Sequence, residues 1–182
     1  GSVRICRNNE FLFFAILTST PTNDPGGALK TSVVQRDGAV FSDDSVEIII
    51  YTDPDKKIGY QFVFNAHNTI FDQKYTRSPK QSQVDWNCKN LTVASTTEEG
   101  WWVLEVAIPL SEIGDPKNSL LFNVARNWSD MGYSTLNYTP DYFLPDNMLR
   151  GDFENNIAIV KELEFGAPEF GNWNIRLGAK NI

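Results

Sequence analysis

Apolar and polar residues alternate with a period of two along much of this chain, a pattern typical of β-strands that bury one face. Residues 46–51 and 60–65 both show it, and the Asp- and Pro-containing turn between them predicts an antiparallel hairpin. Residues 101–108 and 120–128 predict two further strands of the same kind. Residues 11–17 are apolar without interruption, which predicts a central, buried strand.

Weaker signals complete the predicted set of elements. A further strand is expected near Phe71, a last core strand over residues 157–160, and one helical turn over residues 109–114. Gly, Pro, Asn and Asp separate the strands at the short intervals of an antiparallel β-sandwich of the Ig-like or jelly-roll type. We assign residues 1–163 to this all-β domain, and residues 164–182 to an additional strand or a linker into a covalently attached neighbouring domain.

Composition narrows the class of protein. The chain has 182 residues, the size of a single sandwich domain, and a formal net charge of −7. Because nucleic-acid binding requires clustered Lys and Arg, and the 16 basic residues are scattered, nucleic acid is not expected as a partner. No apolar run is long enough for membrane insertion. Gly1 and Ser2 have the character of a cloning scar. Cys6 and Cys88 are compatible either with one disulfide in an oxidising compartment or with two free thiols.

Five segments in chain order carry a family resemblance. They are Asn-Glu-Phe-Leu-Phe-Phe-Ala-Ile at 9–16, Phe-Ser-Asp-Asp-Ser-Val-Glu-Ile at 41–48, Tyr-Gln-Phe-Val-Phe-Asn at 60–65, Gly-Trp-Trp-Val-Leu-Glu-Val-Ala-Ile-Pro at 100–109 and Phe-Asn-Val-Ala-Arg at 122–126. Together they resemble the carbohydrate-binding modules of family 9 and the related DOMON-like β-sandwich domains. The resemblance implies a non-catalytic sandwich that binds saccharides, often as a module of a secreted polysaccharide-degrading enzyme, and sometimes with bound calcium.

The chain departs from the family pattern at two places. The Gly-Trp strand has one extra residue, so that Trp102 stands in register with Glu105 and Trp101 is left as a bulge or an edge residue. The family's opening segment, with one or two strands, has no counterpart here. The domain is therefore either shortened or completed by the tail from Glu164 onward, which would replace its first strands.

Aromatic side chains are the candidate platforms for a sugar ring, whose apolar face packs on a flat ring. The resemblance places a first platform at Phe41, directly before the Asp-Asp-Ser-Val-Glu motif. It places a second in a late loop, where Trp128, Tyr138 and Tyr142 are the candidates. Trp86 lies among polar loop residues and is a further candidate, with packing as the alternative for all of the loop aromatics.

Glu47, Gln61 and Arg126 are the candidate hydrogen-bonding groups, because planar polar side chains pair well with sugar hydroxyls. Arg126 falls on the same strand face as its apolar neighbours, however. It is equally compatible with a buried ion pair to Glu47 or Glu105 that serves only the scaffold.

Asp43 and Asp44 are candidate calcium ligands, with Asp37 nearby. Adjacent side chains of a strand point to opposite faces, so one ion rarely takes both. The alternative is that these carboxylates accept hydrogen bonds from nearby backbone groups.

Two other functions need residues that the chain can supply only in part. A glycosidase needs two facing carboxylates, for which Glu47 and Glu105 are the candidate pair. An extracellular haem-binding redox domain needs axial ligands, for which His67 with Met131 or Met148 are the candidates. A third alternative is an adhesive or scaffolding domain without a small ligand. We expect a secreted or cell-envelope domain that binds an oligo- or polysaccharide and is not an enzyme.

Overall fold

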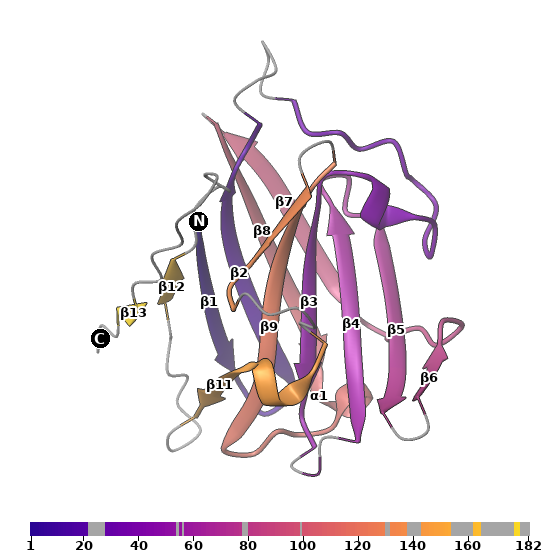
Figure 1. The fold of residues 1–182 in the computed structure, drawn as a ribbon, viewed down its shortest axis with the longest axis vertical. Helices are drawn as coiled ribbons and strands as arrows, with labels where there is room; N and C mark the ends of the chain where they lie inside the picture. Colours follow the sequence, from indigo (N-terminus) through magenta and orange to yellow (C-terminus); the bar gives the residue numbers. More distant parts are fainter. Residues whose placement is uncertain are drawn as a thin grey trace.

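The computed structural model describes residues 1–21, 28–53, 55, 57–77, 80–98, 100–129, 132–137, 143–153, 162–164 and 177–178. Within these residues the chain forms two antiparallel β-sheets that pack face to face, as Figure 1 shows. The predicted all-β sandwich is confirmed, because the side chains that alternate along each strand fill the space between the sheets.

The first sheet has the strand order β13-β12-β1-β2-β8-β7 over the described residues. Its strands are β1 (Ser2–Arg7), β2 (Phe11–Ser19), β7 (Thr92–Glu98), β8 (Trp101–Pro109), β12 (Glu162–Glu164) and β13 (Leu177–Gly178). The central strands β2 and β8 pair over their whole length, from Phe11 opposite Pro109 to Ser19 opposite Trp101. Trp101 is therefore a regular member of the ladder, and the extra residue of this strand makes no bulge at that position.

The second sheet has the order β10-β9-β3-β4-β5-β6, with β11 also paired to β9. Its strands are β3 (Ser45–Tyr51), β4 (Ile58–Asn65), β5 (Ile70–Arg77), β6 (Lys80–Gln83), β9 (Ser119–Trp128), β10 (Gly132–Thr135) and β11 (Leu149–Asp152). The predicted hairpin is confirmed by the antiparallel register of β3 and β4, in which Ser45 faces Asn65 and Ile50 faces Tyr60. The sequence alternation did not predict β1, β6, β7, β10 or β11.

The core lies between the two sheets and is built from the inward residues of every long strand. On β3 these are Val46, Ile48 and Ile50, each fully buried. The same cluster includes Leu12, Phe14, Ile16, Phe62, Phe64, Trp102, Leu104, Ile108, Phe122 and Val124. Burial of this much apolar surface is the main force that holds the sheets together, at roughly 25 cal/mol for each Å² removed from water.

The chain between β8 and β9 forms the predicted helical turn. It is the short helix α1 (Leu110–Ile113), which ends at Gly114 with φ of 79°. That backbone angle favours glycine, so the predicted stop is confirmed. Within the described residues, no helix is long and apolar enough to cross a membrane.

The C-terminal tail contributes to the edge of the first sheet. Strand β12 pairs with β1, with Ser2 opposite Glu164 and Val3 opposite Leu163, and β13 pairs with β12. Tail residues thus lie beside the N-terminal strand, the position at which the sequence suggested a replacement for missing strands. The proposed division after residue 163 falls inside β12. The last predicted core strand, residues 157–160, lies outside the described residues.

The two cysteines are free thiols at different depths of the sandwich. Cys6 pairs in register with Phe13, so its side chain points out from the sandwich. Cys88 belongs to the buried core cluster. The alternative of two free thiols is therefore the one that this fold adopts.

Candidate functional site

The outer face of the second sheet carries a row of polar side chains across three strands. Its members are Glu47 on β3, Gln61 on β4 and Gln73 on β5. Gln61 pairs in register with Gln73 on one side and with Ile49 on the other, and Glu47 lies two residues from Ile49 on the same face. Gln61 Nε2 donates a hydrogen bond of 2.5 Å to Glu47 Oε1, and Gln73 Nε2 donates to Gln61 Oε1. Two of the predicted ligand residues, Glu47 and Gln61, are thus brought together.

This Glu47–Gln61–Gln73 relay has a fixed direction. The amide of Gln61 donates to a carboxylate on one side, so its oxygen accepts from Gln73 on the other side. Glu47 and Gln61 are each 8 % exposed, which places a charge-assisted hydrogen bond where little water competes with it. The row is preorganised to bond hydroxyl groups that lie over it.

Phe41 stands beside the relay. It belongs to the short 3-10 helix η1 (Val40–Ser42), and 56 % of its side chain is exposed. Its ring meets that of Phe71 edge to face, with centroids 6.0 Å apart and planes at 87°. Phe71 pairs in register with Val63, which in turn pairs with Glu47, so the two rings adjoin the polar row.

The η1 turn is held in place by Asn127 of β9. Its Nδ2 donates to the carbonyl oxygen of Phe41 and, at 3.0 Å, to that of Asp43. These bonds hold the backbone of Phe41 in a fixed position at one end of the polar row. An exposed aromatic ring on a fixed backbone loses little entropy when a ligand packs on it.

Asp43 anchors the chain that precedes η1. Its Oδ1 accepts hydrogen bonds from Ser32 N at 3.0 Å and Ser32 Oγ at 2.6 Å, and its Oδ2 accepts from Val33 N at 2.8 Å and Asn65 Nδ2 at 2.9 Å. Burial alone would raise the pKa of this carboxyl, but the bonds from Ser32, Val33 and Asn65 together lower it. Asp43 is therefore an ionised structural anchor.

Asp44 does the same for the neighbouring segments. Its Oδ2 accepts from Lys30 N at 2.8 Å, and its Oδ1 accepts from Arg126 NH2 at 3.1 Å and Ser129 N at 3.4 Å. The oxygens of both aspartates thus face N–H and O–H donors, whose hydrogens occupy the positions that a cation would need.

The calcium hypothesis for Asp43 and Asp44 does not fit this arrangement. An ion would have to displace several hydrogen bonds from each carboxylate. Over the described part of the chain, no group of three or more His, Cys, Asp or Glu side chains is placed to hold a metal ion. The alternative, that the two carboxylates bond nearby backbone groups, describes their contacts.

Arg126 is buried, which corrects its prediction as a ligand residue. None of it is exposed, because it points into the sandwich and its guanidinium lies over the rings of Trp128 at 4.2 Å and Trp102 at 5.1 Å. Burial lowers its pKa to about 10, against the opposing effect of Asp44. The alternative of a scaffold ion pair holds, but the partner is Asp44 rather than Glu47 or Glu105.

Trp128 and Trp86 also differ from their prediction as platforms. Trp128 is 3 % exposed, covers Arg126 and donates from its indole nitrogen to Ser134 Oγ at 3.4 Å. Trp86 is half-buried and packs on Tyr60 and Phe62, at 5.3 and 6.2 Å between ring centroids, on the core side of β4. The second sheet separates it from the relay.

The remaining candidates, Tyr138 and Tyr142, lie outside the described residues. Phe143, which follows Tyr142 in the sequence, meets Tyr75, which meets Tyr51, with ring centroids 5.9 and 5.7 Å apart. These rings pack with Ile49 and Met148 over the far end of the same sheet face. The face is therefore bounded by one aromatic cluster at this end and by Phe41 with Phe71 at the other.

Phe71 and Gln73 are site residues that the sequence did not single out. Their signal was available in principle, because alternation along β5 puts Phe71, Gln73 and Tyr75 on one face. What was lacking was the register that aligns this face with Gln61 and Glu47.

The two candidate carboxylates of a glycosidase lie on different surfaces. Glu47 is on the outer face of the second sheet, whereas Glu105 pairs with Ala15 and points out from the first sheet. The whole sandwich separates them, so they do not face one substrate.

The haem candidates are also apart. His67 is in the exposed turn that follows Asn65 at one end of β4. Met148 packs on Tyr51 and Tyr75, whose register partner Gly59 is at the other end of β4. The third candidate, Met131, lies outside the described residues.

Comparison with known proteins places this sandwich in a class. The sequence profile of the family described as "Carbohydrate family 9 binding domain-like" matches residues 19–136. No match was found among the curated proteins. The chain belongs to the carbohydrate family 9 binding domain-like family, and non-catalytic carbohydrate binding is the function that this membership assigns.

Solved structures share the fold at low sequence identity. A putative carbohydrate-binding protein from Bacteroides uniformis has a TM-score of 0.59 and 14 % identity, over 79 % of this chain and 72 % of that one. A family 9 carbohydrate-binding module from Caldicellulosiruptor kristjanssonii, in complex with glucose, has a TM-score of 0.56 and 14 % identity, over 84 % and 77 % of the two chains. Its complex with cellotriose has a TM-score of 0.57 and 13 % identity, over 85 % and 77 %.

Proposed function

We propose that the domain binds a neutral saccharide on the outer face of the second sheet, between Phe41 and the Glu47–Gln61–Gln73 relay. The observation that carries this proposal is the exposed ring of Phe41 beside a preformed polar row. A sugar presents an apolar ring face and a rim of hydroxyls, and these two surfaces match an aromatic ring and a row of planar polar groups.

Each group has a defined part in this binding. The ring of Phe41 packs on the apolar face of the sugar, and Phe71 supports it from the edge. Glu47 accepts hydrogen bonds from hydroxyls in addition to the one from Gln61, since a carboxylate has about four acceptor positions. Gln73 and Gln61 hold that carboxylate in orientation.

Charge favours neutral over acidic saccharides. Glu47 is a buried acidic group at the centre of the face, and the chain as a whole carries a net charge of −7. A uronic acid would place a second carboxylate near Glu47 in a region of low water content, where like charges repel strongly. The relatives in complex with glucose and cellotriose support a neutral glucan as the first ligand to try.

The domain is further proposed to act outside the cytoplasm, as a module of a larger glycan-processing protein. Family membership supports this proposal. Fractionation of cells that express the full-length protein would place it in the medium or the envelope. Recovery in the cytoplasm alone would contradict it.

Isothermal titration calorimetry with glucose, cellotriose and a panel of other neutral oligosaccharides tests the site. Phe41→Ala and Glu47→Gln should each weaken binding about 10- to 100-fold, as loss of a central contact usually does. Trp101→Ala is the matched control, because Trp101 is also an exposed aromatic residue but lies on the other sheet. The Trp101→Ala variant should bind the saccharide with the affinity of the wild-type protein.

Two results would contradict the proposal in different ways. If wild-type protein binds a saccharide and both site variants bind equally well, the site lies elsewhere. If folded wild-type protein binds no neutral saccharide, the proposed ligand class is wrong.

Trp128→Ala, by contrast, should lower the melting temperature of the protein, because it removes a buried ring from its place over Arg126.

A further inference from the structure

The outer face of the first sheet is unusually apolar for a surface that meets water. On β2 the outward side chains are Phe11, Phe13, Ala15 and Leu17, and each is only partly buried. On β8 the outward Trp101 is 44 % exposed. An antiparallel sheet with one solvated face normally has polar residues there, and contiguous exposed apolar patches commonly mark a binding surface. Saccharide binding on the other sheet does not use this face.

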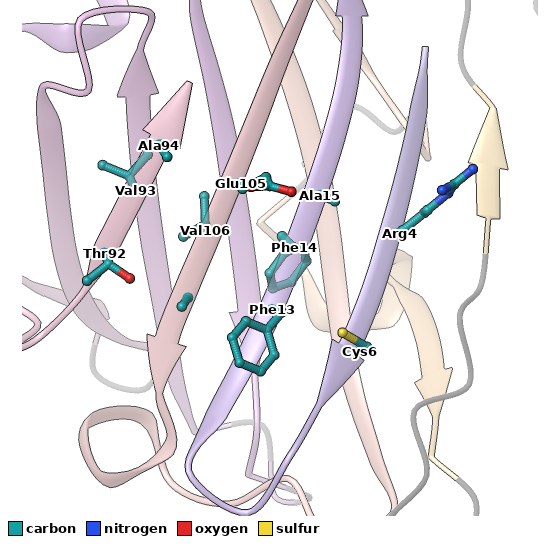
Figure 2. Close-up of a pocket in the computed structure, with 11 residues that line it drawn as sticks. Arg4, Cys6, Phe13, Phe14, Ala15, Thr92, Val93, Ala94, Glu105 and Val106 are labelled. Atoms are coloured by element: carbon teal, nitrogen blue, oxygen red, sulfur yellow. The ribbon is translucent and has the colours of Figure 1, made fainter. Parts of the chain in front are cut away.

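A groove of about 540 Å³ runs over the patch. Figure 2 shows Phe13 and Ala15 on β2, Glu105 on β8, and Arg4 and Cys6 on β1 around it. Its shape follows from the pairing of the two central strands. Phe13 faces Ala107, and Ala15 faces Glu105, so that each strand presents one large and one small side chain at these two levels.

This arrangement is complementary to itself. Consider a second copy related by a two-fold axis that runs parallel to the strands, between β2 and β8. The rotation lays β2 of one copy over β8 of the other without moving either along the strand direction. The partner's Phe13 then stands over Ala107, and the partner's Glu105 stands over Ala15. Each large side chain enters the space left by an alanine, as in other well-packed isologous interfaces.

The charges are complementary in the same arrangement. Arg4 on β1 pairs in register with Ala15, on the side opposite to Glu105. The partner's Glu105, standing over Ala15, is therefore one strand away from Arg4. Figure 2 shows the exposed Arg4 side chain turned toward β12 in the single chain, so its guanidinium turns from its present contacts to meet this carboxylate in the dimer. The symmetry repeats this contact on the other side. The edge strand β7 presents the exposed Thr92 and Thr96, which give the apolar centre a polar rim.

We propose that two copies of this chain associate through the outer faces of their first sheets, centred on Phe13, Ala15, Glu105 and Ala107. The strands β1, β2, β8 and β7 have six, nine, nine and seven residues. At about 3.3 Å per residue and about 4.8 Å between strands, they offer roughly 500 Å² per copy. This is the lower end for a specific interface, so the dimer forms reversibly and depends on concentration. Its two saccharide faces point away from each other.

Sedimentation equilibrium across a range of protein concentrations measures this association directly. Wild-type protein should shift from monomer to dimer. Arg4→Glu and Glu105→Arg should each weaken the dimer at least tenfold, because each brings like charges together. The double variant R4E/E105R should restore it to within about threefold of wild type, since the symmetric contact is rebuilt with exchanged signs.

A second exchange tests shape without charge. Phe13→Ala and Ala107→Phe should each weaken the dimer, the first by leaving a space and the second by filling one, and F13A/A107F should restore it. Arg150→Glu, an exposed charge change on β11 of the other sheet, is the control and should have no effect. Unchanged melting curves establish that each variant is folded.

A wild-type chain that stays monomeric up to about millimolar concentration would overturn the proposal and leave this face to another occupant, such as a neighbouring domain. A dimer in which neither double exchange restores association would overturn the proposed interface. Neither result depends on saccharide binding, which is measured on the other sheet.

Discussion

At the scale of single residues, the three carboxylates of the Asp-Asp-Ser-Val-Glu motif have different roles. Asp43 holds the segment of Ser32 and Val33, Asp44 holds Arg126, and Glu47 points to the opposite side of the sheet, where it meets Gln61. Three carboxylates within five positions thus serve two structural anchors and one candidate binding group. Their different roles follow from the neighbours that each one meets.

The pKa of Asp43 leads to a prediction about acid stability. Because its folded pKa is lowered, the ionised carboxylate stabilises the fold above the unfolded pKa, and this stabilisation is lost as the pH falls through the folded value. Asp43→Asn should therefore lower the free energy of unfolding at pH 7 by about 1–3 kcal/mol, and by progressively less as the pH falls below the ordinary pKa of an aspartate. Urea denaturation at a series of pH values measures both quantities.

The exposed Asp85 provides the matched control for this variant. Asp85→Asn should change the free energy of unfolding little at either pH. An Asp43→Asn protein whose loss of stability is the same at pH 7 and pH 2 would show that ionisation of Asp43 is not the source of the stabilisation.

At the scale of elements, the candidate site depends on the alignment of three strands rather than on any one of them. Strand β4 brings Gln61 between Ile49 of β3 and Gln73 of β5. A shift of one residue in either register would turn the polar row to the core side. The same alignment places Gly59 of β4 opposite Tyr75 of β5, and this pairing leaves no room for a larger residue.

Gly59→Ala should therefore destabilise the second sheet. A Cβ atom at this position would overlap Cζ of Tyr75, so the ring would have to move out of its contacts with Tyr51 and Phe143. Overpacking of this kind costs about 1–3 kcal/mol, which urea denaturation resolves. In a Tyr75→Ala background the same change should cost much less. An equal cost in both backgrounds would assign the effect to the backbone of β4 instead.

At the scale of the whole molecule, the sandwich presents two outer faces of different character. One carries the polar relay and Phe41, and the other carries the apolar groove of Figure 2. The reactivity of the two cysteines can test this arrangement, because Cys6 is on the outer face of the first sheet and Cys88 is between the sheets. Burial raises the pKa of the Cys88 thiol to about 12, and burial also raises that of Cys6.

Thiol labelling in dilute solution should therefore separate the two cysteines. With a disulfide reagent such as dithionitrobenzoate, Cys6 should react first, and Cys88 should react only when denaturant opens the core. Peptide mapping after labelling identifies each site. Recovery of a peptide that joins Cys6 to Cys88 under non-reducing conditions would contradict the free-thiol state of this fold.

Much of the site lay beyond prediction from single residues. Trp128 and Arg126 have the composition of a ligand site, since an aromatic ring and a cation suit a sugar, but they satisfy each other inside the sandwich. Phe71 and Gln73 share one face of β5, but only the register of β5 with β4 brings them to Glu47 and Gln61, where they complete the face. The chemical type of a side chain limits which groups it can contact, whereas its neighbours in the folded chain determine which groups it does contact.

The sequence by itself determined the elements that have a strong local period. The alternation over residues 46–51, 60–65, 101–108 and 120–128 predicted strands with the correct inward faces, because alternate side chains of a strand necessarily point to opposite sides. The ordered motifs also indicated the family that the profile match established. Tertiary structure alone decided the register between strands and the sheet to which each strand belongs. Those long-range choices placed Glu47 and Glu105 on opposite faces, gave Arg126 to Asp44, and left β2 with an apolar side toward water, since they depend on packing the whole chain at once.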